Sequence, residues 1–155
     1  MIINVRGVNT ARSKMLRRAR NIRNTRGVNG RIITDWFKVV QVNFQTSGGG
    51  HKPTKRWKPL KPATLSQKKR QRYSSKPLIR TGTLRQQWLT QADNRGGKLT
   101  STARAKGGTN YGAVHEKGSK KRNIPKRKIL PTLKHASVIA TKHMGKHVKF
   151  AIKVT

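Results

Sequence analysis

The chain has 155 residues and a mass of 17.5 kDa, with 38 Lys and Arg against 3 Asp and Glu, so its formal net charge is +35. The length fits one domain with an arm, and an apolar share of 32% allows only a small core. The absence of cysteine excludes disulfides, thiolate catalysis and cysteine-ligated zinc. Because no apolar run reaches about 18 residues and none follows the basic N-terminus, we expect neither a membrane helix nor a signal peptide.

Carboxylate side chains are scarce, namely Asp35, Asp93 and Glu116. Hydrolases, nucleases and phosphoryl transferases commonly need several carboxylates, so we expect no enzyme activity and no cofactor. His143 and His147 have the spacing of a metal pair on a helix, but Gly145 between them predicts a helix break, and no carboxylate completes the site. We therefore expect no metal.

Residues 1–30 hold eight Lys and Arg and no acid. Thr10 can cap a helix that reaches about Asn24. Its apolar residues recur at helical spacing: Met15, Leu16, Ala19 and Ile22. This basic amphipathic helix either lies on its own domain or forms an arm that orders on phosphate or on a neighbouring subunit. The tetrapeptide Arg-Gly-Val-Asn, present at 6–9 and at 26–29, is interpreted as flanking turns.

Residues 31–45 are the most apolar stretch of the chain. Ile32, Trp36 and Val40 follow a 3.6-residue period, which predicts a helix whose apolar stripe enters the core. The β-branched content of the same stretch favours a strand as the alternative. A glycine-rich loop near 46–56 follows, and we expect it to be flexible.

Two short helices are expected in the middle of the chain. The first covers 64–72 with Thr64 as its cap, and the second starts at Thr81-Gly82 and continues through Leu89.

The last third mixes strand and helix signals. A weak strand is expected at 99–105 and an exposed basic loop at 117–128. Thr132 can cap a helix to about Met144, which Gly145 would end. The final ten residues alternate apolar and other side chains, which predicts a half-buried strand. The expected fold is therefore α+β: helices pack on a small, mostly antiparallel sheet, with 1–30 as a basic helical arm and 31–155 as a single domain.

The basic residues are the main functional signal. Neutralising several phosphates with them would give strong, salt-sensitive, sequence-independent binding. Trp57 and Tyr73 lie in a basic segment and could stack on bases, or pack under their own loops. The candidate contacts with nucleic acid or an acidic partner are Arg17, Arg18, Lys52, Lys55, Arg56, Lys68, Lys69, Arg70, Lys120, Lys121 and Arg122.

Four motifs stand in order between residues 57 and 130. They read Trp-Lys-Pro-Leu-Lys-Pro-Ala-Thr at 57–64, Leu-Ile-Arg-Thr-Gly-Thr-Leu-Arg at 78–85, Tyr-Gly-Ala-Val-His-Glu-Lys-Gly at 111–118 and Ile-Pro-Lys-Arg-Lys-Ile-Leu at 124–130. Together they resemble the phage virion-morphogenesis, or tail-completion, family. The motif residues to which we assign structural roles are Trp57, Leu60, Thr81, Gly82, Leu84, Tyr111, His115, Gly118, Pro125, Arg127 and Leu130.

The resemblance implies a structural virion protein of the neck or proximal tail, assembled in the host cytoplasm. Such proteins form rings, here expected to be six-fold or twelve-fold, that join the tail to the DNA-filled head. The implied partners are copies of the chain itself, head-completion, tail-terminator or tail-tube proteins, and the packaged DNA, without a membrane. A free nucleic-acid-binding protein of ribosomal or nucleoid type is the alternative.

Overall fold

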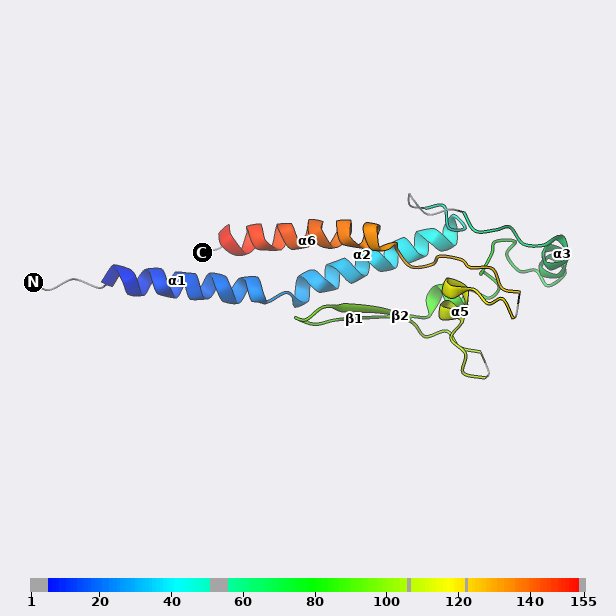
Figure 1. Cartoon of the computed structure of the whole chain (residues 1–155), viewed down its shortest axis with the longest axis horizontal. Helices are drawn as coiled ribbons and strands as arrows, with labels where there is room; N and C mark the ends of the chain where they lie inside the picture. Colours follow the sequence, from blue (N-terminus) through cyan, green and yellow to red (C-terminus); the bar gives the residue numbers. More distant parts are fainter. Residues whose placement is uncertain (1–5, 51–55, 106, 122, 154–155) are drawn as a thin grey trace, which may run out of the picture.

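The computed structural model describes residues 6–50, 56–105, 107–121 and 123–153, and it is elongated, with long helices at one end (Figure 1). Helices combine with one two-stranded antiparallel sheet in the described part of the chain, which confirms the α+β prediction. None of the described helices is long and apolar enough to cross a membrane. The elements are α1 (Arg6–Arg23), α2 (Arg26–Gln45), α3 (Pro62–Arg70), α4 (Thr83–Gln86), β1 (Trp88–Ala92), β2 (Gly97–Ser101), α5 (Tyr111–Lys117) and α6 (Leu133–Lys153).

The prediction of turns at both Arg-Gly-Val-Asn copies is wrong, because each copy lies inside a helix, in α1 and in α2. The break between these helices is at 24–25. The Thr25 hydroxyl donates to the Asn94 carbonyl oxygen at 2.7 Å, and the Arg26 amide donates to Asn94 Oδ1 at 2.9 Å. The β1–β2 turn thus satisfies an amide at the start of α2 that has no helical partner. Helix α2 therefore crosses the boundary expected at residue 30.

Helix α2 confirms the helical interpretation of 31–45 and supplies much of the core. One face packs against the hairpin, where a Cβ at Gly97 would collide with the Ile33 side chain, so glycine permits the close approach. Buried Asn43 donates to the Ile129 carbonyl oxygen at 3.0 Å. The cluster farther along α2 contains Val40, Phe44, Trp57, Leu84, Ala103 and Ile129.

The helix expected from Thr81 through Leu89 is shorter than predicted. Helix α4 ends at Gln86, and strand β1 begins at Trp88, whose indole N–H donates to the Leu84 carbonyl oxygen at 2.7 Å. Strand β1 pairs with β2 from Trp88↔Ser101 to Ala92↔Gly97. The strand expected at 99–105 is therefore present, but it starts at Gly97 and ends at Ser101. Helix α3 begins after Lys61, with Pro62 in its first turn, so Thr64 is not its cap.

The predicted helix stop at Gly145 and the predicted C-terminal strand are both wrong, because α6 continues to Lys153. Helix α6 lies against α2 and the end of α1 (Figure 1). Ala151 is buried, and His147 Nε2 lies 3.2 Å from the Ile22 carbonyl oxygen. These contacts stabilise a helix over a sequence whose alternation favours a strand.

We expect Gly145→Ala to stabilise the protein. A Cβ at this position would have no heavy atom within 4 Å, and Ala is favoured over Gly in a helix interior by about 0.5–1 kcal/mol. Urea unfolding should show that the free energy of unfolding of the variant is higher by about 0.5–1 kcal/mol. The matched variant Gly118→Ala should destabilise, because Gly118 has φ +76° and its Cβ would lie 3.0 Å from the Lys126 amide nitrogen. Destabilisation by Gly145→Ala would contradict a continuous α6.

Candidate nucleic-acid interface

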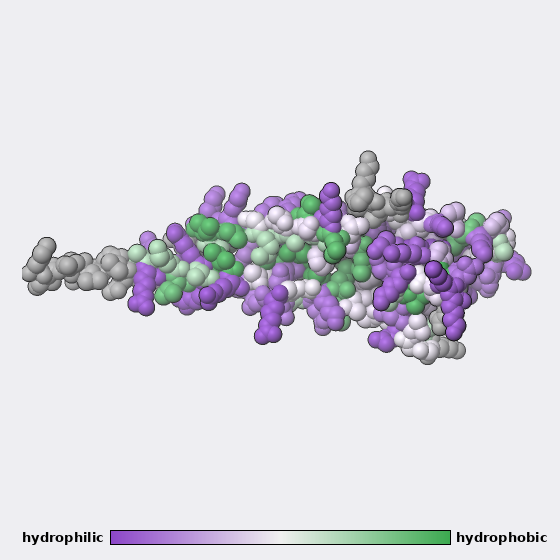
Figure 2. Space-filling view, in the orientation of Figure 1, coloured by the Kyte–Doolittle hydropathy of each residue, from purple (hydrophilic) through white to green (hydrophobic). Residues whose placement is uncertain are grey.

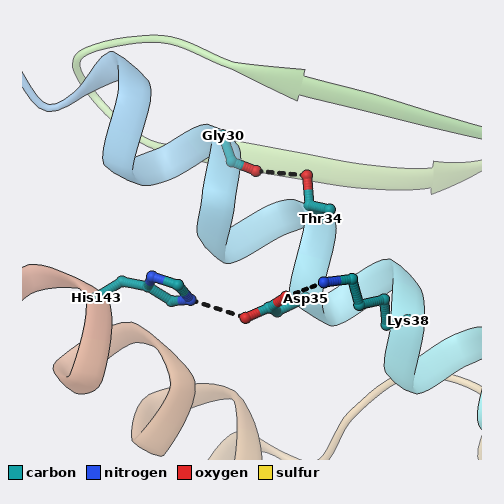
Figure 3. A network of polar contacts seen from close by, with 5 residues as sticks. All are labelled: Gly30, Thr34, Asp35, Lys38 and His143. Atoms are coloured by element: carbon teal, nitrogen blue, oxygen red, sulfur yellow. Dashed lines mark hydrogen bonds and ion pairs between the residues drawn. The ribbon is translucent and has the colours of Figure 1, made fainter.

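The Asp35 carboxylate is bound within the chain, between α2 and α6 (Figure 3). Its Oδ2 lies 2.8 Å from His143 Nε2, and its Oδ1 lies 2.9 Å from Lys38 Nζ. The hydrogen bond from His143, followed by that from Lys38, lowers the pKa of Asp35 below its ordinary value of 3.8. His143 therefore joins two helices, and among the described residues no group of His, Asp and Glu could hold a metal.

The other two carboxylates are also used within the chain. Asp93 Oδ1 accepts the amides of Arg95 at 2.7 Å and Gly96 at 2.9 Å, which fixes the hairpin turn. Glu116 Oε2 accepts the amides of Ile129 at 2.6 Å and Leu130 at 3.2 Å. All three side-chain carboxylates thus have internal partners, and the exposed cations far outnumber them.

Lys68 has a different role from the one predicted. Its ammonium donates to the carbonyl oxygens of Ser74 at 2.8 Å, and of Lys76 and Ile79 at 2.7 Å each. Burial lowers the pKa of Lys68, and the nearby Arg127 and Arg80 charges lower it further. All three ammonium protons are used to hold the segment after α3, so Lys68 is a structural residue.

A matched pair of neighbours tests this assignment. Lys68→Gln should lower the free energy of unfolding by about 1–3 kcal/mol, because three carbonyl oxygens lose a charged donor. Lys69→Gln, at an exposed position, should leave stability within about 0.5 kcal/mol. Thermal and urea unfolding measure both. Equal stabilities for the two variants would show that the three Lys68 hydrogen bonds contribute nothing.

The basic segment after α5 is a loop that exposes most of its lysines, as expected, and hydrogen bonds close it into a turn. The Ser119 amide donates to the Ile124 carbonyl oxygen at 2.9 Å, and the Ile124 amide donates back at 2.8 Å. At its base, the Arg127 amide donates to the His115 carbonyl oxygen at 2.8 Å. Gly118, with φ +76°, makes the chain reversal at the start of this turn. Lys120 and Lys121 are exposed in this turn.

A hollow of about 430 Å³ lies beside this turn. Four exposed lysines line it: Lys58, Lys117, Lys120 and Lys126. Its other walls are residues 118–119 and 123–125, and no Asp or Glu is among the described residues that line it. Four lysines around one hollow without a counter-charge favour an anion such as a phosphate. We call these four residues the lysine hollow.

The predicted contact residues do not form one site. Arg17 and Arg18 lie on α1, far along the molecule from α3 and α5 (Figure 1). Arg56, Lys69 and Arg70 are exposed, and Lys120 lines the hollow. Lys52, Lys55 and Arg122 lie outside the described residues. The residues that sequence reasoning missed are Lys58, Lys117 and Lys126.

The motif residues differ in their burial. Trp57 is 6% exposed, so it packs under its loop and is not available to stack on bases. Gly82 has φ +86° before α4, and Leu84 is buried. The motif predicts that Tyr111 is tucked inside the subunit, but Tyr111 is 44% exposed at the start of α5, so this prediction is wrong. Among the other motif residues, Arg127 is buried, and five are half-buried: Leu60, His115, Gly118, Pro125 and Leu130. Thr81 is exposed, and its hydroxyl forms a hydrogen bond with that of Thr83.

Because His115 is partly buried, we expect the protein to lose stability in mild acid. Burial, together with the Arg127 charge, lowers the pKa of His115 below 6.5. The unfolded chain therefore binds a proton at a higher pH than the folded chain. Neutral His115 thus contributes to the free energy of unfolding fully above about pH 6.5, and this contribution decreases as the pH falls. Thermal unfolding from pH 7.5 to 5 should show the decrease, and His115→Gln should reduce it. An unchanged pH dependence in that variant would exclude His115 as its source.

Comparisons with protein-family models, with curated proteins and with solved structures found no match for this chain.

Proposed function

We propose that the chain is a structural protein of a phage virion, located in the neck or proximal tail, where copies form a ring that joins the tail to the DNA-filled head. In this proposal it catalyses no reaction. The lysine hollow contacts the phosphate backbone of the packaged DNA end, and other surfaces contact neighbouring virion proteins.

The observation that carries the proposal is that the four motif segments pack as one unit. Trp57 from the first motif donates its indole N–H to the Lys128 carbonyl oxygen of the fourth motif at 3.0 Å. Leu84 from the second motif belongs to the same buried cluster as Trp57 and Ile129. Glu116 from the third motif accepts the Ile129 amide. The four segments whose order resembles that of one family are thus in contact with one another in the folded chain.

The charge distribution supports an assembly role. With its three carboxylates engaged internally, the chain has no acidic side chain left to neutralise a net charge of +35. Such a compact chain repels itself and needs external anions. Packaged DNA and acidic virion proteins supply them in a neck.

Mass spectrometry of purified particles, separated into heads and tails, tests the proposal. We expect the protein in one of the two fractions at the copy number of a ring, from a few to about a dozen per particle. Its absence from mature particles would contradict the proposal. A free nucleic-acid-binding protein, the second candidate that the lysine hollow favours, would then be the better account.

A further inference from the structure

The helical end of the molecule carries a second cationic surface that differs from the lysine hollow. Every residue of α1 from Thr10 to Arg20 is exposed, including Met15 at 69%. On the neighbouring α6, Phe150 is 66% and Val138 is 60% exposed. Figure 2 shows hydrophobic residues (green) lying between hydrophilic ones (purple) over these helices. Most of the large apolar side chains that are exposed in the described residues lie on α1 and α6.

The charges on this surface have one sign. Neither α1 nor α6 contains an Asp or Glu. In α1, Lys14 and Arg17 are three residues apart, as are Arg17 and Arg20, and like charges at this spacing destabilise a helix. Most helical stability in proteins comes from packing of an apolar face, and residues 10–20 of α1 are all exposed. Helix α1 therefore needs a partner that supplies both negative charge and apolar contact.

We propose that the α1–α6 surface, defined by Met15, Leu16 and Phe150 with the arginines of α1, docks an acidic protein surface of a neighbouring virion component. DNA is disfavoured here, because its phosphates make no apolar contact with a methionine or a phenylalanine side chain. A second copy is disfavoured, because its own carboxylates are already engaged by internal partners. Guanidinium groups match carboxylates in paired hydrogen bonds.

This inference rests on the proposed function, and it assigns the two ends of the molecule to different partners. The lysine hollow has no large apolar side chain that is strongly exposed among its described lining residues, whereas the α1–α6 surface mixes apolar and cationic groups. Figure 1 places α1 toward one end of the long axis and the segment after α5, which lines the hollow, toward the other. One chain can therefore contact DNA with one end and protein with the other.

Site-specific photo-crosslinking in assembling particles tests the inference. A photoreactive residue replaces Met15 or Phe150, and Leu89 on β1, which is 47% exposed, is the matched control position. We expect Met15 and Phe150 to cross-link to one protein other than this chain, through a segment rich in Asp and Glu, and Leu89 not to do so. In the Met15 probe, Arg17→Glu with Arg20→Glu should reduce the cross-link at least about tenfold, whereas Lys at both positions, which keeps the charge and loses the paired hydrogen bonds, should reduce it less.

Several outcomes would overturn the inference. Cross-links to a second copy, to DNA or to lipid would each assign the surface to another partner. Particles that contain the protein but give no cross-link would show that the surface stays open to solvent. Particles without the protein would instead contradict the proposed function, so failure of the docking surface and failure of the function are distinguishable.

Discussion

Replacing the four residues of the lysine hollow by glutamine should reduce DNA affinity at 0.1 M salt by at least about a hundredfold. The variant is Lys58→Gln, Lys117→Gln, Lys120→Gln and Lys126→Gln. Each lysine that neutralises a phosphate of duplex DNA contributes about 0.9 to the slope of log K against log salt, so the slope should fall by about three to four. Fluorescence anisotropy with a labelled 30-base-pair duplex over a range of salt concentrations gives both quantities.

The control for this variant removes the same number of charges elsewhere. Four exposed lysines of α6 serve this purpose: Lys134, Lys142, Lys146 and Lys149. Their replacement by glutamine lowers the net charge equally, so it reports the general loss of attraction. We expect a slope change of less than about one in this control, and unchanged unfolding temperatures for both variants. Equal losses of affinity in the hollow variant and in the α6 control would show that DNA binding depends only on the total charge.

Trp57→Ala should destabilise the protein by about 3–5 kcal/mol, a large part of the 5–15 kcal/mol typical of a domain. The indole packs edge-on to Phe44, with ring centroids 5.8 Å apart and an interplanar angle of 81°. Its N–H also joins the first and fourth motifs through the Lys128 carbonyl oxygen. Gly48 lies against this ring, because a Cβ there would be 2.6 Å from Trp57 Cδ1.

Trp57→Phe is the matched variant, because it keeps an aromatic ring and loses the hydrogen bond. It should cost about 1–3 kcal/mol. Urea unfolding followed by far-ultraviolet circular dichroism measures both variants without depending on the tryptophan signal. A loss below about 1 kcal/mol for Trp57→Ala would contradict the role of Trp57 in joining the motifs.

The parts of the fold that were predictable are those where local pattern and packing agree. The 3.6-residue period of Ile32, Trp36 and Val40 predicted α2 because that helix buries the apolar stripe it presents. The end of the chain was not predictable in this way. Its alternation favours a strand, and the helix there depends on contacts of α6 with α1 and α2, which are distant in sequence.

The candidate site was predictable only in part. Charge density in the sequence indicated Lys120, but Lys58 reaches the same hollow from a segment about sixty residues earlier. Charge density alone also misassigned Lys68, since nothing local distinguishes it from the exposed Lys69. The carbonyl oxygens of Ser74, Lys76 and Ile79 that bind it converge only when the chain folds.

Cryo-electron microscopy of the neck of the intact particle tests the central claim most directly. We expect a ring in which each subunit directs the lysine hollow toward the DNA channel and the α1–α6 surface toward an acidic neighbouring protein. A neck in which no ring fits this fold, or a ring with the hollow directed away from the DNA, would contradict the account.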